Sequence, residues 1–292
     1  MLFESEKTFF TSVLNDGLSG NFSVHKVEHV GGGDINHAVK VTTSADSFFV
    51  KWNQFAETDM FEKEMDGLVL LSQTDCMDVV KPLNYGTHEG KHFLILEHIE
   101  RGRQNRYFWE EFGRNLAKLH QNSHSQFGLQ YDNYIGRLPQ SNKPDVKWNQ
   151  FFIEQRLTPL VAQGREKGII SRGLLEQFES FYKIMDELIP TEQPALLHGD
   201  LWSGNFICGP NGQAWLIDPA VYYGNREMEL AFTQLFGGFD QRFYQSYQEA
   251  FPLIPGFDDR VEIHNLYPLL VHLNLFGSSY LSGIISTLNK YT

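Results

Sequence analysis

The change in side-chain periodicity near residue 99 most constrains the fold of this 292-residue chain. Before it, apolar residues alternate in short runs separated by polar or glycine-containing turns: "VHKVEHV", "HAVKVTT", "FFVKW", "VVKPLNYG" and "HFLILEHI". After it, apolar residues recur at three- and four-residue steps almost to the C-terminus. The pattern predicts an α+β protein of two lobes, a small β-rich N-lobe over residues 1–98 and a large, mainly helical C-lobe over residues 99–292.

Helical spacing interrupts the strand-rich part only at residues 57–73, where Phe61, Leu68 and Leu71 share one face. In the C-lobe the stretch 123–144 is rich in Asn, Gln, Ser and Gly, which predicts a long ordered loop. The other C-lobe spacings predict helices over residues 104–122, 148–163, 172–188, 227–236 and 240–251, and a broken helical run from 261 onward.

Composition and charge exclude several classes of protein. The chain has 24 Lys and Arg against 36 Asp and Glu, and this net charge of −12 disfavours nucleic acid and anionic membranes as partners. Cys76 and Cys208 are its only cysteines, which is neither a disulfide framework nor a metal-ligand spacing. The N-terminus carries charges where an export signal needs an apolar run, and Pro268 and Asn274 interrupt the longest apolar tract. We therefore expect a cytoplasmic protein without membrane attachment.

The segment "LLHGDLWSGNF" places a carboxylate, Asp200, five residues before a carboxamide, Asn205. The following "NFICGPNGQAWLID" has the pattern of a β-hairpin with Asn211-Gly212 as a two-residue turn. That turn would place Asn205 directly opposite Asp218. Two oxygen ligands side by side suit Mg²⁺, which proteins usually bind through one or two oxygens together with water and phosphate.

This order of residues matches the phosphoryl-transfer template of a catalytic base, a metal ligand five residues later, and a further metal-binding Asp. Asp and Asn are also ordinary turn residues, so the interpretation depends on finding the template's other parts upstream. Those parts are a glycine-rich turn over the phosphates, a lysine on the third strand and a helical glutamate. The candidates are Gly31, Gly32 and Gly33 for the turn, Lys51 for the lysine, and Glu64, with Glu62 as its rival, for the glutamate.

The chain also resembles a known family. "LLHGDLWSGN" and "LIDP", with "YYGNREMELAFTQLFGGF", "YQEAFPL" and "NLYPLLVHLNLFG", are similar to the fructosamine/ketosamine kinases, relatives of the aminoglycoside phosphotransferases within the protein-kinase-like fold. The resemblance extends from the glycine turn to the last helix. The chain departs from the family pattern at Asn225 and Pro268, where we expect histidines. Neither position is one of the predicted metal ligands, Asn205 and Asp218.

The resemblance implies an ATP- and Mg²⁺-dependent kinase that phosphorylates the sugar-derived O3 hydroxyl of a ketosamine. Asp200 would accept the proton of that hydroxyl, and Asn205 and Asp218 would hold Mg²⁺. The ATP-binding residues that it implies are Gly31, Gly32, Gly33, Lys51 and Glu64 for the phosphates and the backbone of Glu97, His98 and Ile99 for adenine.

Several nearby side chains have both a structural and a functional interpretation. Trp202 is either a core residue or a platform on which the sugar stacks, and His272 is either a core histidine or a substrate contact. His120 is expected to be structural. Glu227 and Glu229 are expected to anchor the segment that follows the metal-binding residues.

Two other functions remain open at the level of sequence. One is a kinase for another small alcohol, such as an aminoglycoside, choline, homoserine or thioribose. The other is a non-catalytic nucleotide-binding protein of the same fold, although Lys51, Asp200, Asn205 and Asp218 are all present. The tryptophan of "LWSGN" favours ketosamines, whose amine is a free amino acid, a small metabolite or a protein lysine.

Overall fold

The computed structural model describes residues 2–31 and 35–291, and the chain divides into two compact units. The first comprises the chain up to Phe108 together with Gly204–Pro219, and the second comprises Trp109–Ser203 together with the chain from Ala220. The segment 204–219 belongs to the first unit because its strand β11 (Ala214–Leu216) pairs in parallel with β4 (Asp78–Val79). The units therefore do not follow a single cut of the chain at residue 98.

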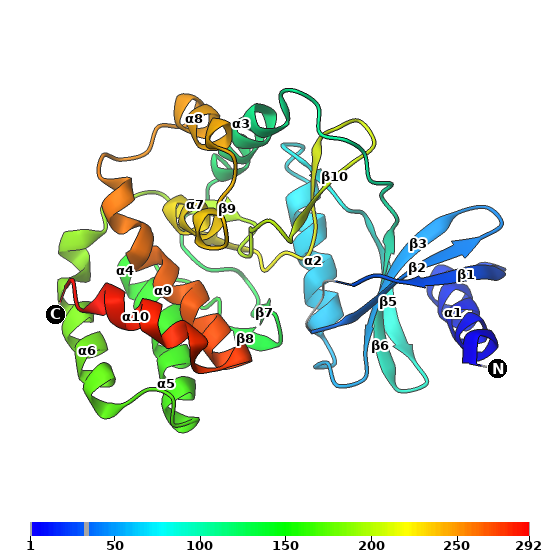
Figure 1. Cartoon of the computed structure of the whole chain (residues 1–292), viewed down its shortest axis with the longest axis horizontal. Helices are drawn as coiled ribbons and strands as arrows, with labels where there is room; N and C mark the ends of the chain where they lie inside the picture. The colour runs from blue at the N-terminus through cyan, green and yellow to red at the C-terminus, as the bar shows by residue number, and fades with distance from the viewer. Residues whose placement is uncertain (1, 32–34, 292) are drawn as a thin grey trace. The chain divides into compact units, whose positions relative to one another are not determined.

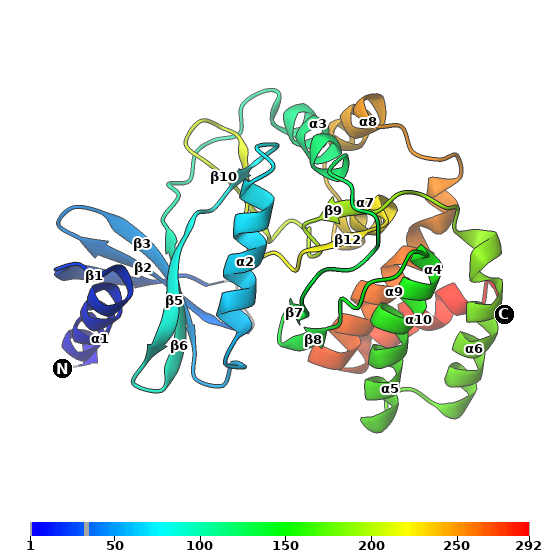
Figure 2. The same ribbon diagram turned by 180° about the vertical axis from the view of Figure 1, so that it is seen from behind.

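The first unit is built on a five-stranded antiparallel sheet of order β1-β2-β3-β6-β5. This sheet lies between two helices, α1 (Leu2–Leu18) and α2 (Met60–Ser72) (Figures 1 and 2). All five sheet strands and the helix α2 confirm sequence-based predictions. The strands are β1 (Val24–His29), β2 (His37–Thr43), β3 (Ser47–Asn53), β5 (Pro82–His88) and β6 (Lys91–Glu97).

Alternation along β3 separates the core from the candidate site. Val50 belongs to a buried apolar cluster that also contains Val13 and Leu14 of α1. Because successive strand side chains point to opposite faces, Lys51 projects from the other face of the sheet. The helix α1 was not predicted from the sequence, although its Phe10, Val13 and Leu14 are fully buried.

The second unit is mainly helical. Its core includes Phe151, Phe152, Phe178 and Phe181, and the predicted helices are confirmed to within a few residues at most ends. The predicted helix 148–163 contains a π-helical turn, η1. The helices are α3 (Phe108–His120), α4 (Trp148–Phe151), η1 (Phe152–Leu157), α5 (Thr158–Glu166), α6 (Arg172–Leu188), α7 (Arg226–Leu235), α8 (Gln241–Ala250), α9 (Phe257–Phe276), the 3₁₀ turn η2 (Ser278–Tyr280) and α10 (Leu281–Leu288).

Two short strand pairs were missed by the sequence analysis. The stretch 123–144, predicted as a loop, contains the hairpin of β7 (Asn133–Ile135) and β8 (Leu138–Gln140), which lies beside α9 (Figures 1 and 2). In addition, β9 (Ala195–Leu197) pairs with β12 (Tyr222–Gly224). Strands of three residues are too short for alternation to identify them.

Membrane-spanning helices are not found in the described parts of the chain, since none of their helices combines the length and the apolar composition that crossing a bilayer needs. The longest, α9, has His264, Asn265 and Asn274 buried within its 20 residues.

Candidate active site

In the first unit, Lys51 forms the centre of a buried ion-pair cluster. The side chain projects from β3 with only 6% of the residue exposed. Its Nζ lies 2.8 and 2.9 Å from the two carboxylate oxygens of Glu64 on α2, and 3.0 Å from Oδ1 of Asp218. The rival Glu62 lies instead 3.7 Å from Nζ of Lys63. Of the two predicted glutamates, Glu64 is therefore the one that pairs with Lys51.

Opposing effects determine the protonation of this cluster. Burial alone would lower the pKa of Lys51, but Asp218 and Glu64 together outweigh it and raise that pKa well above its usual value. Burial also raises the pKa of Glu64, against the effect of Lys51. Lys51 is thus a permanently charged ammonium group that is held in place by two carboxylates.

The predicted register of the hairpin after Asn205 is wrong by one residue. β10 (Phe206–Cys208) pairs with β11 so that Phe206 lies opposite Leu216, and the N–H of Ile217 donates to the carbonyl of Asn205 (3.1 Å). Asn205 is therefore opposite Ile217, and Asp218 follows one residue later. The cause is a three-residue loop, residues 210–212, in place of the predicted two-residue turn.

Pro210 explains this longer loop. The N–H of Gly212 donates to the carbonyl of Gly209 (3.0 Å), and Gly209 also pairs with Gln213, which closes the hairpin around Pro210, Asn211 and Gly212. Proline favours the second position of a type I turn, and a glycine at φ +75° supplies the left-handed residue that completes such a loop. Pro210 was the available sequence evidence against a two-residue turn.

Asp218 and Asn205 are oxygen donors of the kind that Mg²⁺ takes. Asp218 has a left-handed backbone (φ +55°), and its side chain contacts Lys51 while remaining 41% exposed. Asn205 is buried, and its carbonyl is bonded to the residue that precedes Asp218. The described residues contain no group of three His, Cys, Asp or Glu side chains that could hold a metal ion. A carboxylate and an amide oxygen are the kind of ligands that suit a cation which also keeps water and phosphate among its ligands.

In the second unit, Glu229 of α7 holds the backbone that leads into Asp200. Its fully buried carboxylate accepts from the N–H groups of His198 (3.1 Å) and Gly199 (2.7 Å). Nε2 of His120 donates to the same carboxylate (2.9 Å), and the other ring nitrogen lies 2.8 Å from the hydroxyl of Tyr247. The predicted structural role of His120 is confirmed, and Glu229 directly supports the loop that carries Asp200.

Electrostatics keep Glu229 charged. Burial alone would raise the pKa of its carboxyl group, but the hydrogen bond from His120 and the amide of Gly199 outweigh burial and hold that pKa below its usual value. Glu227 was also predicted to anchor the segment after the metal-binding residues. Its carboxylate instead pairs with two residues of α9, Arg260 (2.6 Å) and His264 (3.3 Å).

Gly199 occupies a position that only glycine tolerates. Its φ is +83°, and an added Cβ would lie 2.0 Å from the carbonyl oxygen of Ala220. The N–H of Ala220 in turn donates to the carbonyl of His198 (2.9 Å). This close approach explains why a glycine stands where the protein-kinase template has arginine.

Asp200 lines a small pocket in the second unit. The volume is about 10 Å³, which is barely enough for one water molecule. The other lining residues, which come from β7, α7 and α9, are Ile135, Phe232, Tyr267, Pro268, Val271 and His272.

The two predicted substrate-side residues meet through one aromatic ring. The ring centre of Phe236 lies 6.2 Å from that of Trp202, in an edge-to-face arrangement, and 4.7 Å from that of His272. Nδ1 of His272 lies 2.7 Å from the carbonyl of Pro268 and therefore donates to it. Burial lowers the pKa of His272 against that hydrogen bond, so the ring is neutral at pH 7 and Nε2 is an acceptor. Pro268, noted only as a departure from the family pattern, thus orients a ring of the pocket.

The remaining predicted residues belong to the first unit. Gly31 has open space around it, whereas Gly32 and Gly33 lie outside the described residues. The Glu97 carboxylate accepts from the N–H of Lys81 (2.7 Å), and Nδ1 of His98 lies 3.4 Å from Glu100. The adenine-binding role of residues 97–99 stays a prediction.

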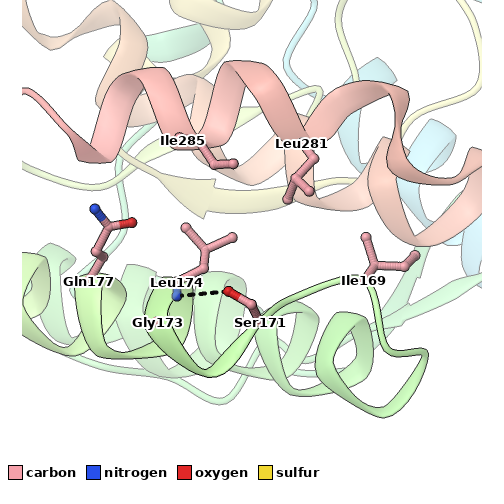
Figure 3. A pocket seen from close by; sticks show the side chains of 7 residues that line it. All are labelled: Ile169, Ser171, Gly173, Leu174, Gln177, Leu281 and Ile285. Carbon is pink, nitrogen blue, oxygen red and sulfur yellow. Dashed lines mark hydrogen bonds between the residues drawn. The ribbon is translucent and has the colours of Figure 1, made fainter.

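A larger hollow of about 450 Å³ lies between α6 and α10 (Figure 3). Its walls are mostly apolar. The hydroxyl oxygen of Ser171 accepts from the N–H of Leu174 (3.2 Å) and so caps the N-terminus of α6. No predicted site residue lines it. The residues predicted to carry the catalytic chemistry lie instead around Lys51 and Asp200.

Comparison with known proteins gives a consistent result. Residues 7–292 match the model of the fructosamine kinase family. A Synechocystis protein named as a ketoamine kinase is 40% identical over 260 residues, which cover 89% of this chain and 88% of that protein. A Haemophilus somnus crystal structure, described as a fructosamine-3-kinase, superposes with a TM-score of 0.88 at 27% identity over 100% and 99% of the two chains.

A more distant structure supports the predicted fold class. Spectinomycin phosphotransferase, crystallised with ADP and spectinomycin, has a TM-score of 0.59 at 14% identity and covers 97% of this chain and 92% of its own. At that identity the likeness concerns the fold alone. The α+β, protein-kinase-like fold that was predicted from the sequence is confirmed.

Proposed function

Because the chain belongs to the fructosamine kinase family, we propose that it transfers the γ-phosphoryl group of ATP to the O3 hydroxyl of a ketosamine. The observation that carries the proposal is the contact of Lys51 with both Glu64 and Asp218. Phosphoryl transfer in the protein-kinase fold needs this strand lysine, its helical glutamate and a metal-binding aspartate together. A protein of this fold that had lost catalysis would not need all three.

In this proposal, the first unit binds the nucleotide. The ammonium group of Lys51 contacts the phosphates, and Glu64 holds it there. The turn of Gly31, Gly32 and Gly33 covers the phosphates. The backbone of Glu97, His98 and Ile99 pairs with adenine.

Asp218 and Asn205 would hold Mg²⁺, since a half-exposed carboxylate and an amide oxygen match its preference for hard oxygen ligands. When bound, the cation neutralises phosphate charge that builds up during transfer. Asp218 also contacts Lys51, so the carboxylate that would hold the cation is itself held by the lysine.

Asp200 would act as the general base. The acceptor oxygen attacks the γ-phosphorus, the bond from phosphorus to the bridging oxygen of ADP breaks, and the hydroxyl proton passes to the Asp200 carboxylate. Glu229 holds the backbone of the preceding residues, so the carboxylate is positioned before substrate arrives. Trp202 and His272 flank the sugar, whose amine is a small molecule or a protein lysine.

The test is an acceptor panel with the wild-type chain and Asp200→Asn. We expect a fructosyl- or ribulosyl-amine to exceed free fructose, aminoglycosides and choline by at least about tenfold in kcat/KM, roughly 1.4 kcal/mol of transition-state preference. Asp200→Asn should lower kcat by about 10² to 10⁴ and leave ADP binding unchanged. Asp186→Asn, an exposed carboxylate of α6, is the matched control. Normal turnover by Asp200→Asn, or a better aminoglycoside or choline substrate, would refute the proposal.

A further inference from the structure

A line of buried polar side chains runs from η1 to the pocket that Asp200 lines. Nη2 of Arg156 donates to Oδ1 of Asn142 (2.7 Å), and Nδ2 of Asn142 donates to Oδ1 of Asn133 (2.9 Å). Nε2 of Gln140 donates to the same Asn133 oxygen (2.8 Å), and the hydroxyl of Tyr267 donates to Oε1 of Gln140 (2.5 Å). All five residues, which we name the Arg156 network, are buried and belong to the second unit.

The network has only one arrangement of its protons. A guanidinium group donates and never accepts, so the Asn142 atom that it contacts must be the carbonyl oxygen. Asn142 then donates to Asn133, whose oxygen also accepts from Gln140. With its amide nitrogen used in this way, Gln140 presents its oxygen to Tyr267. Backbone carbonyls fix the same orientations, because the amide nitrogens of Asn142, Asn133 and Gln140 also donate to the carbonyls of Tyr131 (3.1 Å), Val221 (2.8 Å) and Ala220 (3.1 Å). Arg156 and these carbonyls together hold each amide up to Tyr267 in one orientation.

Arg156 is an expensive residue to bury. It is 0% exposed, and its hydrogen bonds go to neutral oxygens, those of Asn142 and the carbonyls of Ser141 and Gln155. Its guanidinium carbon lies 4.0 Å from the ring centre of Tyr222 and 4.6 Å from that of Phe151. Removing a cation from water is unfavourable, and neutral hydrogen-bond partners offset only part of that free energy. Arg156 is therefore unlike a residue that is buried for stability alone. It also projects from a π-helical turn, a feature often found at functional sites.

The network contacts both sides of the Asp200 pocket. Gln140 donates to the carbonyl of Ala220 (3.1 Å), and Ala220 is the residue bonded to His198 in the loop that carries Asp200. At its other end the network holds Tyr267, which lines the pocket beside Asp200. The hairpin that supplies Gln140 also supplies Ile135 to the pocket wall.

We propose that the Arg156 network is a positioning scaffold for the phosphoryl acceptor, with Gln140 and Tyr267 as its positioning residues. It fixes the wall formed by Tyr267 relative to the loop of Asp200 and so determines how the acceptor hydroxyl is aligned. This inference rests on the proposed function. It assigns to the 133–142 segment and to Arg156 a role in acceptor use, separate from nucleotide binding.

The decisive variant is Tyr267→Phe, which removes one oxygen atom and leaves the ring in the pocket wall. We expect kcat/KM for the ketosamine to fall about tenfold, through a higher acceptor KM, because the ring loses its anchor. The KM for ATP and the slow hydrolysis of ATP by water should stay within about twofold of the wild-type values. A merely structural role would move all of these quantities together.

Two further variants sharpen the test. Gln140→Met keeps the volume but removes the hydrogen bonds, and the double variant with Tyr267→Phe should be no worse than Gln140→Met alone, since both act through one contact. Tyr182→Phe removes a hydroxyl buried in α6 of the same unit and should leave the acceptor KM unchanged.

Two results overturn the inference: an acceptor KM within about twofold of wild type in Tyr267→Phe, or an equal loss of acceptor-independent ATP hydrolysis. If Gln140→Met does not fold, Tyr267→Phe decides alone. A wild-type chain that phosphorylates no ketosamine refutes the proposed function instead. In that case the same variants are measured with the best acceptor of the panel, and unchanged KM values there overturn the scaffold.

Discussion

Replacing Glu229 by glutamine tests whether one buried carboxylate holds the catalytic loop. The substitution keeps the size of the side chain but removes the charge that two backbone N–H groups and His120 share. It also turns an NH₂ group toward at least one of these donors. The catalytic loop should therefore lose part of its support without any change in the residues that it carries.

The size of the effect follows from the two backbone hydrogen bonds to Glu229. A hydrogen bond to a charged acceptor contributes about 1.5–3 kcal/mol, against about 1 kcal/mol for a neutral one. Losing that difference at the two backbone donors costs about 2.5 kcal/mol, and the melting temperature should fall by roughly 5 °C or more. A displacement of the loop by about 1 Å should lower kcat by about 10².

The assay compares thermal melting and ketosamine kinase kinetics of Glu229→Gln with those of Glu192→Gln. Glu192 forms an ion pair with Arg226, also on α7, at 2.7 Å and is nearly buried. The control should lower the melting temperature and leave kcat within about twofold. The reasoning is refuted if Glu229→Gln retains wild-type kcat, or if both variants lose kcat equally.

Three other predictions concern the metal ligands, the sugar platform and acid stability. Asp218→Ala should reduce Mg²⁺-supported turnover more than Asn205→Ala, because it deletes a charged ligand, and a Mg²⁺ titration of kcat checks the order. Trp202→Ala should reduce the preference for ketosamines over free fructose and leave the ATP KM unchanged; a raised ATP KM with intact ketosamine use would contradict it. Burial alone would raise the pKa of Glu227, but Arg260 and His264 outweigh burial and lower that pKa to about 2. The ionised carboxylate therefore contributes about 3 kcal/mol to the free energy of unfolding above pH 4.5, and this contribution is lost as the pH falls toward 2. Glu227→Gln should flatten that part of the stability curve in denaturant unfolding at pH 2–6, and an unchanged slope would count against the assignment.

Local rules explain where sequence reasoning succeeded. The strands β2 and β3 and the helix α6 follow from periodicities of 2 and 3.6, which any chain with these residues must satisfy to bury an apolar face. The order of Lys51, Asp200, Asn205 and Asp218 was sufficient to predict the chemistry, because a phosphoryl-transfer site needs a base, a lysine and oxygen ligands in defined roles.

The misses occurred where the deciding contact is distant in sequence or depends on one turn residue. A two-residue turn at Asn211-Gly212 was predicted because that dipeptide favours it, but Pro210 lengthened the loop and shifted the register. The strand β9 has only three residues, and its partner β12 lies more than twenty residues later, so no local pattern marks it.

The sequence by itself determined the fold class and the candidate residues for the chemistry, because both depend on residue type and on spacing along the chain. Only the tertiary structure decided that Glu64, and not Glu62, pairs with Lys51, since both lie on one helix and only its packing on the sheet distinguishes them. It also decided what supports the catalytic loop. Glu229 contacts residues about thirty positions away in the sequence, and contacts at such separations exist only after the chain has folded.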